Sequence, residues 1–380
     1  METARAQDFL ELMERAKRGR LKLYLGFAAG VGKTYRMLEE AHALKKRGID
    51  VVIGFIETHG RPETAALTAG LEHVPTRKIE YRGLTIEEMD VDAVIARTPQ
   101  VALVDEIAHT NPPGCRNGKR YQDVYQILDA GINVICAFNV QHLESLKDVV
   151  QRVTGVVIRE TVPDTFVKQA DQVINIDLAI EDLVDRLRSG KIYNEEKVTW
   201  ALEHFFRDNN LLTLRELALR EVAESVDRVA VASQQMADKP RRRANSRVMV
   251  CMASSSPNAG GLLRRGSRLA GRLNTDWFAV YVETPNEAPH LIDSEAQRRL
   301  IANIEKAREL GAEVVRLHGK NPVHTLIDFA RSHDVGYVMI GRSRSHGLRY
   351  WTRRSVMYEF VAEAEGLDLH IVSFEEEAEE

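Results

Sequence analysis

At 380 residues, the chain is long enough for two or three domains that each bury a core of their own. Hydrophobic residues make up 44% and charged residues 28% of it, which is the composition of a soluble globular protein. The net charge of −4 indicates neither a nucleic-acid partner nor an anionic membrane. Cys115, Cys136 and Cys251 are widely separated and odd in number, which excludes a disulfide framework and a zinc-ligand spacing.

The first twenty residues carry a charged amphipathic pattern, so we expect an N-terminal helix over 1–20 and no signal peptide. No eighteen apolar residues run together, so we expect no transmembrane helix. Both features predict a cytoplasmic protein or, at most, one attached to a membrane surface.

From residue 21 to residue 190, short apolar runs alternate with helical patterns. The runs are LKLYLGF, DVVIGFIE, QVALVDE, INVICAFNV, GVVIRE and QVINID. They are rich in Val and Ile and lack strict alternation, which is typical of strands buried on both faces of a parallel sheet. The pattern predicts a doubly wound α/β domain over 21–190.

Residues 191–236 show no strand pattern and predict a helical extension. Its apolar residues recur at helical spacing and would either pack on the preceding domain or bind a partner; they include Leu211, Leu214, Ala218, Val222, Val226, Val229 and Ala230. The polar, basic segment 237–246 predicts a linker, whose cations could also meet anionic lipid or phosphate.

Strand and helix patterns resume at residue 247. Five further apolar runs predict a second, smaller α/β domain over 247–375: RVMVCMA, DWFAVYVET, AEVVRLHG, GYVMIGR and LDLHIVSF.

The run LKLYL leads into a glycine-rich loop, residues 26–34, and then into a helical pattern. This context is typical of a phosphate-binding loop (the P-loop, or Walker A motif), in which backbone N–H groups and a helix N-terminus hold phosphates. We expect Lys33 to neutralise the β- and γ-phosphates of ATP, and the Thr34 hydroxyl to hold Mg²⁺. The predicted nucleotide-binding residues are Gly26, Gly30, Val31, Gly32, Lys33, Thr34, Tyr35, Asp105 and Asn139.

The loop departs from the usual G-x-x-x-x-G-K-T spacing at its first position. The opening glycine would fall on Phe27, whereas Gly26 stands one residue too early. We therefore expect the start of the loop to differ in shape from the common P-loop.

Two acidic residues follow the strand pattern VALV. Asp105 matches the Walker B position and would place Mg²⁺ together with Thr34. Glu106 would be either a catalytic residue that orients an attacking water or an ordinary polar strand end.

Polar residues also follow two other predicted strands. Because ligands of open α/β sheets bind beyond the carboxyl ends of strands, these residues are candidate sensors of a terminal phosphate, with helix capping or loop structure as the alternative. They are Glu57, His59, Arg61, Asn139, Gln141 and His142.

Six segments together resemble the cytoplasmic N-terminal region of the KdpD family of potassium sensor histidine kinases: GxAAGVGKTY, ETHGRPET, LVDEIAHTNPPG, RYQDV, NVQHLESL and RETVPD. The resemblance covers residues 20–230. A complete member would continue into transmembrane helices, a histidine-containing domain and a catalytic domain, none of which the sequence shows. We expect His142, in QHLES, to be structural and not a phosphoacceptor.

Residues 247–375 resemble a universal-stress-protein domain, which is of the Rossmann type. The ATP-binding pattern of that family, G-x2-G-x9-G-[ST], reads here as Gly341, Arg344, Arg354 and Ser355, so arginine replaces two of its glycines. In KdpD relatives this region is associated with cyclic di-AMP through a Ser-x-Ser element and a later aromatic segment. Ser343 and Ser345, and then Tyr358 and Phe360, resemble these two elements, so the resemblance implies cyclic di-AMP as a second ligand. The predicted second nucleotide site is Gly341, Ser343, Arg344, Ser345, Arg354 and Ser355, with a solvated basic surface as the alternative.

The resemblance implies an ATP-binding regulatory module of the Kdp potassium response, without its own histidine kinase core and not primarily an enzyme. Two alternatives remain open. One is a P-loop ATPase that acts as a conformational switch, and the other is an adaptor that binds a separate Kdp sensor kinase or Kdp regulatory component.

Overall fold

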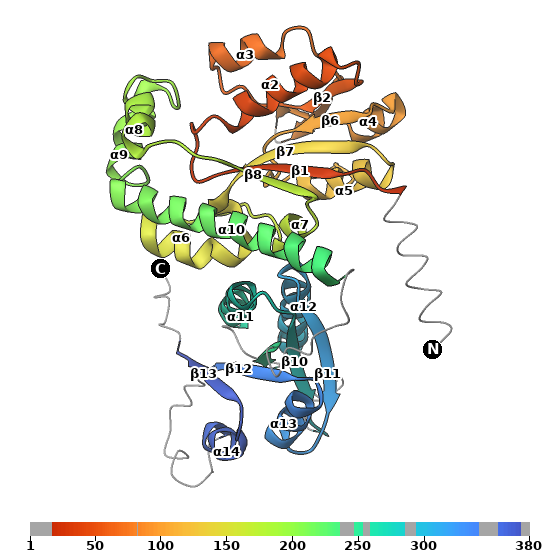
Figure 1. The fold of residues 1–380 in the computed structure, drawn as a ribbon, viewed down its shortest axis with the longest axis vertical. Coiled ribbons are helices and arrows are strands. Elements are labelled where there is room, and N and C mark those ends of the chain that lie inside the picture. Colours follow the sequence, from red (N-terminus) through yellow and green to blue (C-terminus); the bar gives the residue numbers. More distant parts are fainter. Residues whose placement is uncertain are drawn as a thin grey trace. The chain divides into compact units, whose positions relative to one another are not determined.

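The computed structural model describes residues 17–81, 83–235, 247–253, 259–285, 294–341 and 356–373 (Figure 1). The chain divides into two compact units, residues 1–162 with 166–225, and residues 163–165 with 226–380. In the part of the chain that the structure describes, no helix is long and apolar enough to cross a membrane. Most of the expected N-terminal helix and the whole expected linker lie outside the described residues.

The first unit is built on a six-stranded sheet with the order β3-β2-β6-β7-β1-β8. Every neighbouring pair is parallel. Gly26 at the end of β1 lies opposite Asn139 at the end of β7, so the carboxyl ends of these strands share one edge. The strands are β1 (Leu21–Gly26), β2 (Val51–Phe55), β3 (Glu72–His73), β6 (Val101–Val104), β7 (Asn133–Asn139) and β8 (Gln172–Ile176).

Helices cover both faces of this sheet. On one face, α2 (Lys33–Lys46) buries Met37, Leu38 and Ala41 against the strands, beside α3 (Pro62–Thr68). The opposite face carries the larger core, with α4 (Val91–Arg97) and α5 (Arg120–Asp129). The doubly wound α/β class predicted from the apolar runs is therefore confirmed.

The chain continues through short helices into a helical extension. The sequence left open whether the apolar face of this extension packs on the preceding domain or binds a partner. In the structure, part of the apolar face of α10 packs into the larger core of the first unit. Its buried residues are Leu211, Leu214, Leu217 and Ala218. The helices are α6 (Lys147–Thr154), α7 (Asp164–Lys168), α8 (Ile180–Arg188), α9 (Glu195–Glu203) and α10 (Asp208–Gln235), with 3-10 turns at Val140–His142 and Glu144–Leu146.

One sequence-based expectation about strands in this unit fails. The run GVVIRE contains no strand, although residues 155–160 are all described, because Gly155 ends α6 and β8 occupies the sheet position beside β1. Conversely, β4 (Arg77–Tyr81) and β5 (Leu84–Glu88) form an antiparallel hairpin that the sequence did not indicate. Half of its strand residues are charged and most are exposed, so it carries no apolar run.

The second unit contains a five-stranded parallel sheet with the order β11-β10-β9-β12-β13, which matches all five predicted strands. This is the strand order of a Rossmann-type fold. The strands are β9 (Arg247–Met252), β10 (Trp277–Glu283), β11 (Glu313–His318), β12 (Val335–Gly341) and β13 (Asp368–Val372).

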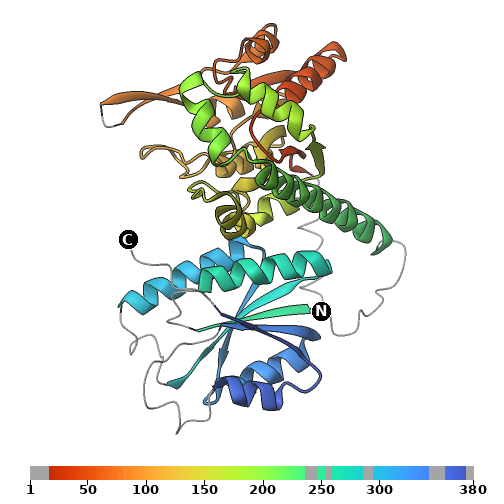
Figure 2. The same ribbon diagram turned by 90° about the vertical axis from the view of Figure 1, so that its left-hand side faces the viewer.

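One helix pair covers each face of this second sheet (Figure 2). Trp277, Val248 and Val250 pack toward the first pair, whereas Phe278, Met249 and Val338 pack toward the second. The pairs are α11 (Ala259–Leu273) with α12 (Ser294–Glu309), and α13 (Pro322–Ser332) with α14 (Val356–Glu363).

Candidate functional site

The loop after β1 exposes the N-terminus of α2 to a potential anion. Gly30 and Gly32 have φ angles of +89° and +106°, a left-handed conformation that strains other residues. Gly32 is the N-cap of α2, and no side chain of the described residues caps the helix. The first turn also contains no acidic residue, so the positive end of the helix dipole is not compensated there.

The structure gives the unusual loop spacing a physical reason. A Cβ atom at Gly26 would lie 2.6 Å from Cγ2 of Val31 and 3.0 Å from Cδ of Lys33. Gly26 is thus needed because the loop folds back onto the strand end. Phe27, which stands where the common pattern has glycine, is 1% exposed and packs into the larger core.

Lys33 is buried and faces the ends of two strands. Its Nζ donates a hydrogen bond of 3.2 Å to the carbonyl oxygen of Ala28, and another to Oδ1 of Asn139. Because β7 lies between β1 and β6, Asn139 stands between the loop and Asp105. Burial lowers the pKa of Lys33 to about 8, against an opposing effect of Asp105 and Glu106.

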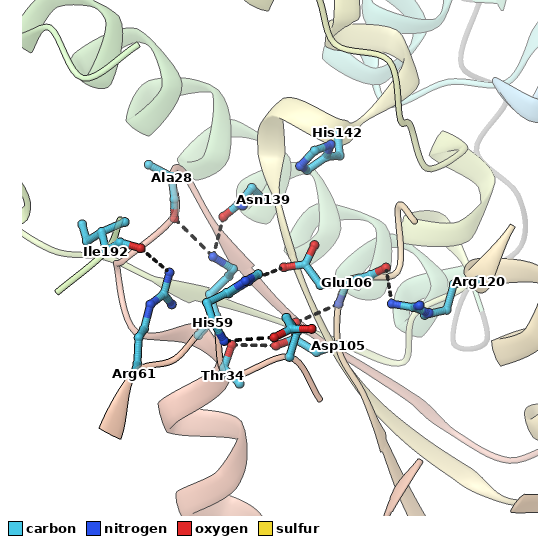
Figure 3. A network of polar contacts seen from close by, with 12 residues as sticks. Ala28, Thr34, His59, Arg61, Asp105, Glu106, Arg120, Asn139, His142 and Ile192 are labelled. Carbon is cyan, nitrogen blue, oxygen red and sulfur yellow. Dashed lines mark hydrogen bonds and ion pairs between the residues drawn. The ribbon is translucent and has the colours of Figure 1, made fainter. Parts of the chain in front are cut away.

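Thr34 and Asp105 are in direct contact (Figure 3). The Thr34 hydroxyl donates a hydrogen bond of 2.7 Å to Oδ2 of Asp105, whose Oδ1 accepts one of 2.9 Å from the backbone N–H of Glu106. Burial, together with the neighbouring Glu106 carboxylate, raises the pKa of Asp105. A hydroxyl and a carboxylate at this spacing are oxygen ligands of the kind that Mg²⁺ prefers.

Glu106 is held in an uncommon backbone conformation, with φ of +53°. His59 Nε2 lies 3.3 Å from Oε1 of Glu106, and this hydrogen bond lowers the pKa of Glu106 and raises that of His59 (Figure 3). The Glu106 carbonyl oxygen accepts a hydrogen bond of 3.4 Å from Arg120. The Glu106 carboxylate is therefore negatively charged and is oriented by its hydrogen bond with His59.

Arg120 belongs to a buried charge cluster that the sequence did not indicate. Its guanidinium is 3.8 Å from the ring centroid of Phe55 and donates a hydrogen bond of 2.8 Å to Glu88. His109 lies 2.7 Å from the other oxygen of Glu88. Both Arg120 and Glu88 are 2% exposed, so this ion pair ties the hairpin to the backbone of Glu106.

A cavity of roughly 650 Å³ lies between the loop after β1 and the side chains of His59, Asp105 and Glu106. Most of the predicted nucleotide-binding residues line it, and so do four of the six candidate sensors, Asn139 being counted in both sets. Gly26, Glu57 and Gln141 are described but lie outside the lining. The predicted residues in its wall are Gly30, Val31, Gly32, Lys33, Thr34, Tyr35, Asp105, Glu106 and Asn139, and the other sensors are His59, Arg61 and His142.

One wall of the cavity comes from a segment that sequence reasoning missed, residues 189–194 between α8 and α9. Its Ile192 is buried, and a Cβ atom at Gly30 would lie 2.2 Å from Cδ1 of Ile192. Arg186, just before the segment, donates a hydrogen bond of 3.0 Å to the Gly30 carbonyl oxygen. The segment follows a helix, so the rule about strand ends could not locate it.

The predicted second nucleotide site falls almost wholly outside the described residues. Gly341 ends β12. Ser343, Arg344, Ser345, Arg354 and Ser355 lie in residues 342–355, which the structure does not describe.

The strand order and the loop after β1 define the first unit as a P-loop NTPase-like α/β domain. Residues 17–226 match the family described as KdpD, osmosensitive K⁺ channel His kinase sensor domain. The chain belongs to the KdpD family.

Relatives of two lengths are similar to this chain. The sensor protein KdpD of Escherichia coli is 42% identical over 368 residues, which are 97% of this chain but 41% of the relative. A KdpD sensor protein of Synechocystis sp. is also 42% identical over 360 residues, which cover 94% of this chain and 95% of the relative. The chain thus spans about two fifths of the first relative and nearly all of the second.

Solved structures of universal stress proteins are also similar to part of the chain. One, in complex with cAMP, is 19% identical, with 35% of this chain and 99% of that chain covered and a TM-score of 0.27. Another, from Archaeoglobus fulgidus, is 19% identical, with 38% and 99% covered and the same TM-score.

Proposed function

We propose that the first unit is an ATP-binding regulatory module in KdpD-type potassium-response signalling. The observation that carries this proposal is the convergence of Lys33, Thr34, Asp105 and Asn139 on one cavity at the uncapped N-terminus of α2. The relatives named sensor protein KdpD support the signalling role.

Each group has a distinct task in this proposal. Backbone N–H groups of the loop and of the first turn of α2 would cradle the phosphates. Lys33 would exchange its hydrogen bonds to Ala28 and Asn139 for contacts with the β- and γ-phosphates. Thr34 and Asp105 would hold Mg²⁺, which neutralises phosphate charge when bound.

The metal part of the proposal is tested by titrating the chain with ATP in the presence and absence of Mg²⁺. We expect Mg²⁺ to tighten ATP binding in the wild type, and Asp105→Asn to abolish most of that gain while ATP alone still binds. An Mg²⁺ effect of unchanged size in a folded Asp105→Asn variant would remove Asp105 from the metal site.

Affinity for Mg²⁺-ATP should pass through a maximum with pH. Because the pKa of Asp105 is raised, its carboxylate takes up a proton at a higher pH than an ordinary aspartate, so affinity rises with pH on the acid side. Lys33 must keep its proton, and its pKa is about 8, so affinity falls as the pH increases through that value. Calorimetric titrations across this range check both limbs. Asp105→Asn should lose the acid limb, and an acid limb that persists in that variant would contradict the assignment.

Hydrolysis is a second candidate function, favoured by the ionised and oriented Glu106 beside Asp105. An arginine finger supplied by another chain can raise the rate by a factor on the order of 10³–10⁵. The isolated chain would react without that contribution, so we expect slow turnover, below about 1 s⁻¹. Phosphate release by the isolated chain measures this rate. A faster rate that is lost in Glu106→Gln would make the protein primarily an ATPase.

A further inference from the structure

Arg61 lines the same cavity and has an unsatisfied donor. It is the N-cap residue of α3, directly after the loop that follows β2. Its Nη2 donates a hydrogen bond of 3.3 Å to the carbonyl oxygen of Ile192. Its Nε is buried and has no hydrogen-bond partner among the described residues. A buried donor without a partner is costly, so its presence here suggests a ligand that completes it.

Arg61 shares this cavity with a second cation, Lys33, and with the carboxylates of Asp105 and Glu106, which favour its charged form. Burial lowers the pKa of Arg61, and its charge contributes to the lowered pKa of Lys33. Two cations thus face the same space from different elements, α2 and the N-terminus of α3. An anionic group between them would relieve this repulsion. The loop and the helix N-terminus would hold the inner phosphates, and Lys33 and Arg61 would share the outermost phosphate.

Arg61 is also connected to the wall formed by residues 189–194. A guanidinium has five donors in a planar fork, so it can bind a phosphate while it keeps its bond to the Ile192 carbonyl. Ile192 in turn packs against Gly30 of the loop (Figure 3 shows Arg61 reaching to Ile192). An anion that holds Arg61 in place would therefore also hold residues 189–194 against the loop.

We propose that Arg61 is the specificity-determining residue that distinguishes a nucleoside triphosphate from a diphosphate, and that its bond to Ile192 transmits this difference to residues 189–194. The inference rests on the proposed nucleotide site and adds which state of the nucleotide the site reports. A triphosphate bridges Lys33 and Arg61, whereas a diphosphate leaves Arg61 without its anion and the wall less constrained.

Affinities of the chain for Mg²⁺-ATP and Mg²⁺-ADP, in the wild type and in Arg61→Gln, test the inference. We expect ATP affinity to fall roughly ten- to a hundredfold, as for a lost charge-assisted hydrogen bond, and ADP affinity to change less than about threefold. Arg188→Ala is the matched control, because Arg188 lies outside the cavity lining, is exposed and is paired with Asp185 at 3.6 Å. It should change both affinities little.

Equal losses for the two nucleotides in Arg61→Gln, or no loss for either, would overturn the role of Arg61 while leaving the proposed function intact. A wild-type chain that binds neither nucleotide would overturn the proposed function, and this inference with it.

Hydrogen exchange measures the transmitted effect directly. Backbone amides of residues 189–194 should exchange more slowly with ATP bound than with ADP bound. Arg61→Lys keeps the charge but replaces the fork with a single ammonium group, so we expect this difference to disappear even where ATP still binds. The same protection by both nucleotides in the wild type would contradict the coupling through Ile192.

Discussion

Replacing Lys33 with alanine is expected to lower ATP affinity by roughly ten- to a hundredfold, because a charge-assisted hydrogen bond contributes about 1.5–3 kcal/mol. The side chain is buried, and its Nζ lies at the carboxyl edge of the sheet beside Asn139. Isothermal titration with Mg²⁺-ATP measures the loss.

Lys33→Met is the matched control for this prediction. It keeps a long apolar side chain in place of the Lys33 stem, which packs beside Gly26, and removes the ammonium group with its charge and its hydrogen bonds. We expect the methionine variant to lose ATP affinity as strongly as the alanine variant, while it unfolds at a temperature closer to that of the wild type. Unchanged affinity in either folded variant would refute the assignment of residues 26–34 as the phosphate-binding loop.

Replacing Arg120 with methionine should destabilise the first unit by about 3–5 kcal/mol, because it leaves the Glu88 carboxylate buried without its main partner. Arg120 and Glu88 are both 2% exposed and lie 2.8 Å apart, and His109 would be the remaining contact of the carboxylate. Denaturant unfolding, followed by a probe in the first unit, measures the change in the free energy of unfolding.

Two variants separate the buried charge from general damage. Glu88→Gln combined with Arg120→Met should recover much of the lost stability, because the uncompensated carboxylate is gone. Arg116→Met breaks an exposed ion pair with Asp92, at 3.1 Å, and should cost no more than about 1 kcal/mol. Equal costs for Arg120→Met and Arg116→Met would show that the buried pair is not a stabilising element.

The sequence predicted most of the sheet because buried parallel strands appear as apolar runs. It failed where that relation does not hold. Half of the strand residues in the hairpin of β4 and β5 are charged, and the hairpin has no such run. The run GVVIRE is apolar, yet Val157 is 57% exposed and the segment pairs with no strand, although all its residues are described.

The candidate site divides in the same way. Lys33, Thr34, Asp105 and Asn139 could be predicted, because residues at the carboxyl ends of parallel strands meet at one edge. Two other parts of the site depend on tertiary packing between distant segments and could not be predicted. They are the hydrogen bond from Arg120 to the backbone of Glu106 and the cavity wall formed by residues 189–194. The early position of Gly26 was visible in the sequence, but its cause, the close approach of Val31, required the structure.

Thermal unfolding of the chain with increasing Mg²⁺-ATP tests the central claim most directly. If the first unit binds ATP in this cavity, a hundredfold excess of ligand over its Kd should raise the free energy of unfolding of that unit by about 2.7 kcal/mol. The gain should be much smaller at the same ATP concentration in Lys33→Met. A wild-type chain whose unfolding temperature is unchanged by millimolar Mg²⁺-ATP would contradict the proposal that this domain is an ATP-binding module.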